Sequence, residues 1–141
     1  MATLLVVDDD PSIRRLLEIV LADAGHDIVT ADDGVMALEV LEEHDEIAIM
    51  LLDVMMPRLD GFGVMSRVRG DQRWETLPVI MLTALAGPEN EKAGYDAGVN
   101  GFITKPFDPD LLTSLVNVTL STSGYRPAGV KVAPPDMNTW E

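Results

Sequence analysis

Short apolar runs alternate along the chain with longer stretches in which apolar residues recur at helical spacing. The apolar runs occupy residues 3–7, 26–31, 47–52, 78–82 and 101–104. Runs of this length favour buried strands, whereas recurrence every three to four residues favours amphipathic helices. Helices are expected at residues 11–24, 34–43, 62–69, 89–97 and 109–121. Because strands that alternate with helices form parallel sheets with helices on both faces, the pattern predicts an α/β protein.

Five strands in roughly 120 residues match the flavodoxin-like doubly wound class, with a five-stranded parallel sheet of order 2-1-3-4-5. The run at 26–31 is more polar than the others, so we place it at a sheet edge. Residues 1–121 make up this predicted domain. Residues 122–141 contain two glycines and three prolines without periodicity, which indicates an extended or disordered tail. The alternative is that Tyr125 or Trp140 docks on this domain or on a partner.

Composition argues against several classes of partner. The formal net charge is −14, whereas nucleic-acid phosphates and anionic membranes attract positively charged proteins. This charge fits either a solvated acidic surface or acidic docking patches. Without cysteine, the chain forms no disulfide and no cysteine-based zinc site. No apolar stretch approaches the roughly 20 residues of a membrane span, and no signal peptide is visible, so we expect a cytoplasmic protein.

Polar side chains follow four of the five predicted strands, at the point where each strand ends. They are Asp8, Asp9, Asp53, Thr83 and Lys105. The carboxyl ends of parallel strands share one edge of the sheet, and ligands of doubly wound proteins bind in the crevice there. Residues spread over nearly the whole chain are therefore expected to meet in one pocket.

The chemistry of these residues points to a metal ion and a phosphoryl group. Clustered carboxylates favour Mg²⁺ or Mn²⁺, a lysine neutralises phosphoryl oxygens, and a threonine hydroxyl can donate to one of them. With no cysteine in the chain, and no serine or histidine at these strand ends, the expected nucleophile is a carboxylate, and aspartyl phosphates are a known product of such attack. Asp53 is the best candidate because its strand is expected to neighbour the strand that carries Asp8 and Asp9.

Other polar residues receive structural interpretations. Asp10 precedes Pro11, which suits a first helical position, so Asp10 is expected to start a helix. Three further aspartates are assigned to turns: Asp32, Asp33 and Asp60. His26 and His44 lie outside the predicted crevice and are expected at the surface.

Four motifs together resemble the receiver domain of two-component response regulators, in particular stand-alone receivers of the chemotaxis-regulator kind. They are VVDDD (6–10), LLDVMMPRLDGF (51–62), PVIMLTA (78–84) and GFITKPF (101–107). The resemblance covers residues 3–121. It leaves open whether the chain is a stand-alone receiver or part of a longer regulator.

The resemblance implies roles for the acidic residues. Asp53 matches the phospho-acceptor. Asp9 matches a direct Mg²⁺ ligand, with Asp8 assisting through water, and the backbone carbonyl of Met55 matches a further ligand.

The resemblance also assigns roles around the phosphoryl site. Lys105 matches the lysine that pairs with the phosphoryl group, and Thr83 matches the hydroxyl that moves toward it. Ala84 fits the need for a small residue there. The peptide bond before Pro106 is expected to be cis, and Phe102 matches the aromatic switch residue.

The implied function is a phosphorylation-dependent signalling switch and not a turnover enzyme. The phosphoryl donor is expected to be a histidine kinase or phosphotransfer protein. Phosphorylation is expected to change the conformation of the segment 84–98 and of the surface formed by the last strand and helix, and this surface would control a protein partner. A phosphorylation-dependent homodimer is one possible outcome of this change. Met55 and Leu85 are apolar, which predicts slow self-dephosphorylation. One alternative is a phosphohydrolase with an aspartate nucleophile. Such enzymes typically need a second acid two residues after the nucleophile, and Met55 occupies that position here. The other alternative is a receiver-fold interaction module.

Overall fold

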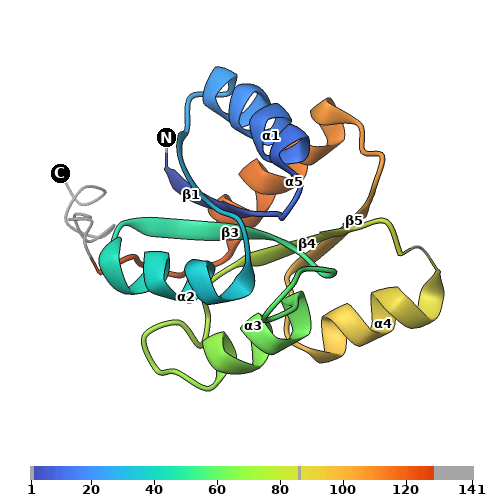
Figure 1. Ribbon diagram of the computed structural model, residues 1–141. Coiled ribbons are helices and arrows are strands. Elements are labelled where there is room, and N and C mark those ends of the chain that lie inside the picture. The colour runs from blue at the N-terminus through green and yellow to red at the C-terminus, as the bar shows by residue number, and fades with distance from the viewer. Residues whose placement is uncertain (1, 86, 129–141) are drawn as a thin grey trace, which may run out of the picture.

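The computed structural model describes residues 2–85 and 87–128 as five strands and five helices in strict alternation (Figure 1). The strands are β1 (Thr3–Val7), β2 (Asp27–Ala31), β3 (Ile47–Asp53), β4 (Val79–Thr83) and β5 (Gly101–Thr104). The helices are α1 (Pro11–Asp23), α2 (Gly34–Glu43), α3 (Gly61–Arg69), α4 (Pro88–Asp96) and α5 (Pro109–Thr122). Each element lies within one or two residues of its predicted position.

The strands form one parallel sheet of order β2-β1-β3-β4-β5, as predicted. The polar β2 is an edge strand, and β1 pairs with both β2 and β3. The register sets Val7 beside Leu52 and Asp53 beside Leu82. The carboxyl ends of β1, β3 and β4 therefore reach the same edge of the sheet.

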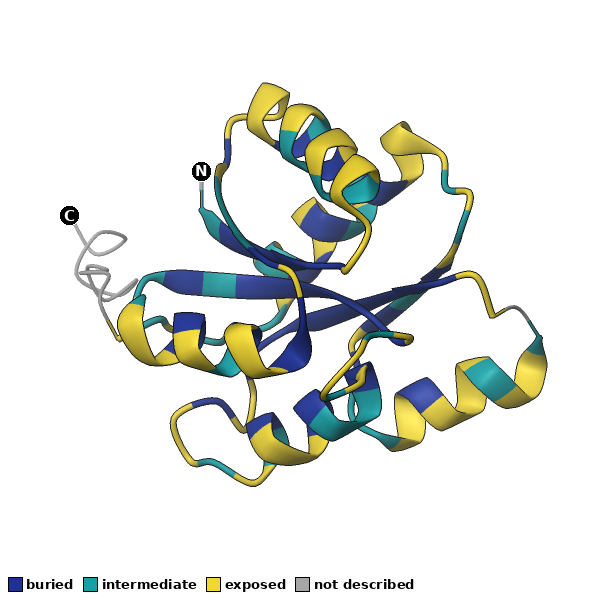
Figure 2. Ribbon diagram, viewed as in Figure 1, coloured by how far each residue is buried: buried dark blue, intermediate teal, exposed yellow. Residues whose placement is uncertain are grey.

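Helices cover both faces of the sheet. Figure 1 shows α1 and α5 on one face and α2, α3 and α4 on the other. Alternate residues of the central strands feed two separate cores: Leu5 and Leu52 join the α2 and α3 side, whereas Leu4 and Leu51 join the α1 and α5 side. The central strands are buried along almost their whole length (Figure 2), which explains why their sequences are continuous apolar runs.

Four helices begin at an aspartate whose carboxylate accepts a hydrogen bond from a backbone N–H of the first turn. The capping residues are Asp10, Asp33, Asp60 and Asp108. Asp10 therefore starts a helix as predicted. Asp33 and Asp60 were assigned to turns, and the structure corrects this assignment because both cap a helix.

One prediction of exposure is wrong. His26 was expected at the surface but is buried. Its Nδ1 accepts a hydrogen bond from the Ala2 N–H at 3.2 Å. Local sequence spacing does not reveal this contact.

The segment after α5 folds back onto the domain as far as residue 128. Tyr125 packs against the core on the α2 and α3 side and lines a small pocket with Asp45 and Trp74. Burial, with the nearby Asp45 carboxylate, raises the pKa of the Tyr125 hydroxyl. This favours docking on the domain for Tyr125, whereas Trp140 lies outside the described residues, as does the predicted tail from residue 129.

Replacing Tyr125 with alanine should lower the free energy of unfolding by about 1–2 kcal/mol, because a half-buried aromatic ring is removed from the core. Urea denaturation followed by circular dichroism measures the change. Arg126→Ala is the matched control, since Arg126 is exposed beside the same pocket and should leave the unfolding midpoint unchanged. Equal midpoints for Y125A and the wild type would show that the docked ring contributes nothing to stability.

Candidate functional site

Three carboxylates meet at the carboxyl edge of the sheet. Asp8 and Asp9 follow β1, and Asp53 ends β3. One carboxylate oxygen from each lies within 4.8 Å of the others, close enough for all three to contact a single ion. Asp8 and Asp53 are buried, at 1% and 5% exposed, whereas Asp9 is exposed. The structure thus brings together three of the five residues that were expected in one pocket.

The chain around Asp8 fixes the orientation of its side chain. The Asp10 N–H donates to Asp8 Oδ1 at 2.9 Å, and the guanidinium of Arg14 donates to the Asp8 carbonyl oxygen at 2.7 Å. The Asp8 N–H donates to the carbonyl oxygen of Ala31 at 3.2 Å. Arg14 was not among the predicted site residues, because it contacts the backbone of Asp8 and no sequence motif indicates this contact.

Lys105 brings the positive charge of the site. Its Nζ lies 2.6 Å from Asp8 Oδ2 and 3.4 Å from Asp53 Oδ1. The Lys105 N–H donates to the carbonyl oxygen of Thr83 at 2.7 Å, and the Lys105–Pro106 peptide bond is cis. Burial alone would lower the pKa of Lys105, but the hydrogen bond and charge of Asp8, with the charge of Asp53, raise it. The ammonium therefore stays protonated at neutral pH.

The carboxyl group of Asp53 carries an unfavourable charge. Burial, with the negative charge of Asp8, raises its pKa to about 6, although Lys105 acts in the opposite direction. In addition, the three carboxylates of the cluster outnumber the ammonium group of Lys105, which leaves an excess of negative charge. A hard divalent cation bound by oxygen ligands would supply the missing charge, so the donor set fits Mg²⁺.

The hydroxyl residue and the aromatic residue lie on neighbouring strands. Thr83 is fully buried at the end of β4, and its Oγ1 accepts a hydrogen bond from the Leu85 N–H at 3.0 Å. Phe102 of β5 is half-buried, and a Cβ added at Gly94 of α4 would lie 3.0 Å from its ring. Phe102 thus lies against α4, and Thr83 leads into the loop before that helix.

Apolar side chains flank the site. Met55 is 64% exposed and Leu85 is 41% exposed, so both project into solvent beside Asp53 and Thr83 in the sequence. Ala84 is exposed between Thr83 and Leu85. No described side chain two residues after Asp53 or Thr83 carries an acid or amide group.

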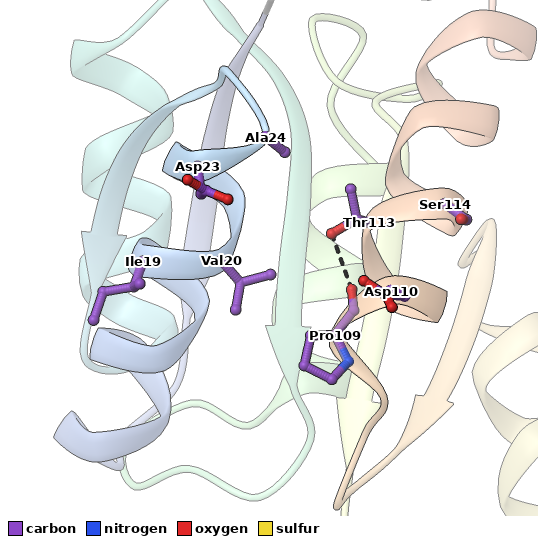
Figure 3. A pocket seen from close by; sticks show the side chains of 8 residues that line it. All are labelled: Ile19, Val20, Asp23, Ala24, Pro109, Asp110, Thr113 and Ser114. Atoms are coloured by element: carbon purple, nitrogen blue, oxygen red, sulfur yellow. Dashed lines mark hydrogen bonds between the residues drawn. The ribbon is translucent and has the colours of Figure 1, made fainter.

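A broad groove of about 820 Å³ lies between α1 and α5 (Figure 3). Ile19 and Val20 line one wall, and Pro109 and Thr113 line the other, where the Thr113 hydroxyl donates to the Pro109 carbonyl oxygen at 2.9 Å. None of the groove's lining residues belongs to the cluster of carboxylates and lysine. The groove is therefore a separate surface feature.

A family model described as the response regulator receiver domain matches residues 4–117. The chain belongs to this family. A chemotaxis protein CheY homologue from Campylobacter jejuni is 34% identical over 120 residues, which are 84% of this chain and 92% of the relative. A putative response regulator from Chloroflexus aurantiacus superposes with a TM-score of 0.81 at 37% identity, covering 85% of this chain and 98% of that chain. The receiver fold and the flavodoxin-like sheet order are therefore shown.

Other relatives are longer than this chain. The DNA-binding dual master transcriptional regulator RpaA from Synechocystis is 38% identical over 133 residues, which are 93% of this chain and 54% of the relative. The chain thus spans about half the length of several curated relatives that it matches. Receiver domains are signalling modules of two-component systems and not turnover enzymes. No helix among the described residues of this receiver is long and apolar enough to cross a bilayer.

Proposed function

We propose that this receiver is a phosphorylation-dependent switch in which Asp53 accepts a phosphoryl group with the help of Mg²⁺ or Mn²⁺. Receiver domains take phosphoryl groups from histidine kinases or phosphotransfer proteins, so one of these is the proposed donor. The observation that carries the proposal is the convergence of Asp53 with Asp8, Asp9 and Lys105 at one edge of the sheet. Such a set combines a nucleophile, oxygen ligands for a metal and a fixed cation.

The residues divide the work of phosphoryl transfer. A carboxylate oxygen of Asp53 forms the bond to phosphorus while the bond between phosphorus and the donor breaks, and the donor leaves with the bonding electrons. Asp8, Asp9 and Asp53, with the carbonyl oxygen of Met55, would hold the metal. Bound Mg²⁺ supplies neutralisation of the phosphoryl charge. Lys105 pairs with a phosphoryl oxygen from the position where it now contacts both buried carboxylates.

Phosphorylation would be read out through Thr83, Phe102 and α4. The new group carries about −1.5 to −2 charges, which attract a hydroxyl donor. If Thr83 turns toward it, the Leu85 N–H loses its present acceptor and the loop before α4 moves. Among its described residues α4 buries only Gly94, so little packing opposes a shift (Figure 2).

The shifted surface of α4, β5 and α5 is the proposed contact for a downstream protein. Phosphorylation-dependent dimerisation through this surface is one form that the contact can take.

Incubation with acetyl phosphate and Mg²⁺, followed by intact mass measurement, tests the proposal. The wild type should gain one phosphoryl group, and both Asp53→Asn and a sample with EDTA should gain none. An unmodified wild type under every donor would leave only the interaction-module reading. Repeated turnover of a phosphate ester would instead revive the phosphohydrolase reading.

The phosphorylated chain should lose its phosphoryl group slowly, over minutes to hours. Hydrolysis needs a water molecule oriented beside the phosphoryl group, and the exposed apolar side chains of Met55 and Leu85 cannot orient one. Met55→Glu should speed the loss by at least about tenfold, since a general base typically contributes that much or more. Intact mass after donor removal gives the rate, with Met36→Glu as a control at an exposed methionine of α2. A wild-type lifetime of seconds contradicts this prediction.

A further inference from the structure

The loop between β3 and α3, residues 54–60, contains an unusual backbone conformation at Arg58. Among residues 2–85 and 87–128, Arg58 is the one non-glycine residue with positive φ, at 70°. The Leu59 N–H donates to the Pro57 carbonyl oxygen at 2.8 Å, which closes a three-residue γ-turn. A γ-turn with positive central φ is the rarer, strained type, and such a conformation persists only where its surroundings hold it.

Asp33 holds Arg58 from the neighbouring β2–α2 connection. The guanidinium of Arg58 forms an ion pair with Asp33 Oδ2. Asp33 is only 2% exposed, and its other oxygen accepts the Met36 N–H at 2.8 Å as the cap of α2. Each carboxylate oxygen thus has its own partner. The Arg58 side chain is 65% exposed, so solvent screens part of the attraction, but without Arg58 the buried carboxylate of Asp33 would lose this compensating charge.

Close backbone packing fixes the same loop on both sides. A Cβ atom added at Gly34, next to Asp33, would overlap the carbonyl oxygen of Leu59. At the loop's end, the Gly61 N–H donates to the Val54 carbonyl oxygen at 2.8 Å. The chain therefore closes immediately after Asp53, with Met55 inside the closed loop.

We propose that the ion pair between Asp33 and Arg58 positions the loop 54–60, so that the Met55 carbonyl oxygen and Asp53 stay together as ligands for Mg²⁺. The inference rests on the proposed function, and it makes Arg58 and Asp33 positioning residues that do not touch the ion. Positioning of the loop by Arg58 and the charge of Arg58 have opposite effects on the affinity for Mg²⁺. If Arg58 contributed only charge, its removal would leave the acidic edge more negative and tighten cation binding. If it positions the loop, its removal weakens binding.

Titration of the unphosphorylated chain with Mg²⁺ in an isothermal titration calorimeter separates the positioning effect of Arg58 from the effect of its charge. Arg58→Ala should bind Mg²⁺ roughly tenfold more weakly than the wild type, as is typical for loss of a group that orients metal ligands. Arg58→Lys should recover part of the affinity. Arg67→Ala is the matched control, because it removes the same charge from an exposed site on α3 and should bind like the wild type. Equal or tighter binding by R58A overturns the proposal.

Amide hydrogen exchange of the metal-free chain tests whether the Asp33–Arg58 ion pair positions the loop 54–60. The Leu59 and Gly61 N–H groups should exchange at least about tenfold faster in R58A than in the wild type, because local opening exposes them. Unchanged exchange at both positions would overturn the proposal that this ion pair positions the loop. A wild type that binds no Mg²⁺ in the calorimetric titration would instead refute the proposed function. Because hydrogen exchange is measured without metal, it tests the role of the Asp33–Arg58 pair separately from that function.

Discussion

In the absence of metal at pH 7, replacing Asp53 with asparagine should raise the free energy of unfolding by about 3 kcal/mol. The pKa of Asp53 is raised to about 6 by burial and by the charge of Asp8. The folded chain therefore binds a proton more tightly than the unfolded chain, whose aspartate titrates near 3.8. This contribution to stability is complete below pH 3.8 and is lost as the pH rises through about 6. Asparagine removes the loss because it carries no charge.

Urea denaturation in EDTA at pH 5 and pH 7 measures this effect. The advantage of D53N over the wild type should be larger at pH 7 than at pH 5, because more of the wild-type carboxyl is ionised at the higher pH. Asp60→Asn is the control, since Asp60 is exposed and asparagine keeps its capping contact with the Gly63 N–H. A D53N chain no more stable than the wild type at pH 7 would show that the charge of Asp53 is already balanced.

Replacing Lys105 with alanine should destabilise the metal-free chain at pH 7 by about 3 kcal/mol. Removing one member of a buried pair leaves an uncompensated charge, and here both Asp8 and Asp53 lose their nearest cation. The pKa of Asp53 should rise further, because Lys105 lowers it in the wild type. Thermal or urea unfolding measures the stability, and carboxyl chemical shifts followed against pH measure the pKa.

Lys92→Ala provides the matched comparison for Lys105. Lys92 also contacts a carboxylate, that of Asp96 at 2.7 Å, but both side chains are largely exposed. Solvent screens such a pair, so its removal should leave the unfolding midpoint almost unchanged. If K105A and K92A behaved alike, the buried carboxylates would not depend on the lysine, and the proposed charge balance of the site would be wrong.

Much of this architecture follows from periodicity. Continuous apolar runs identify strands buried on both faces, and β1, β3 and β4 are buried in this way. Once the strand order is known, polar residues at strand ends must share one edge. For this reason the convergence of Asp8, Asp9 and Asp53 could be predicted from positions about 45 residues apart.

Contacts between side chains and distant backbone could not be predicted in the same way. Asp33 was assigned to a turn, and nothing in its local sequence shows that Arg58 of the β3–α3 loop forms an ion pair with it. His26 begins the predicted strand 26–31, but its burial depends on α5, where Asn117 forms a hydrogen bond with its ring at 3.1 Å. Tyr125 follows the last helix, and its burial depends on how that segment packs on the core. Such contacts join residues that are distant in the sequence, so local sequence patterns do not predict them.

The most direct test of the central claim is to locate the phosphoryl group. After reaction with acetyl phosphate and Mg²⁺, borohydride reduces an aspartyl phosphate to homoserine, which peptide mass spectrometry identifies by position. The account predicts homoserine at position 53 and at no other aspartate, with the signal lost in EDTA. Homoserine at Asp8 or Asp9, or its absence from every peptide after full reaction, would contradict the assignment of Asp53 as the phospho-acceptor.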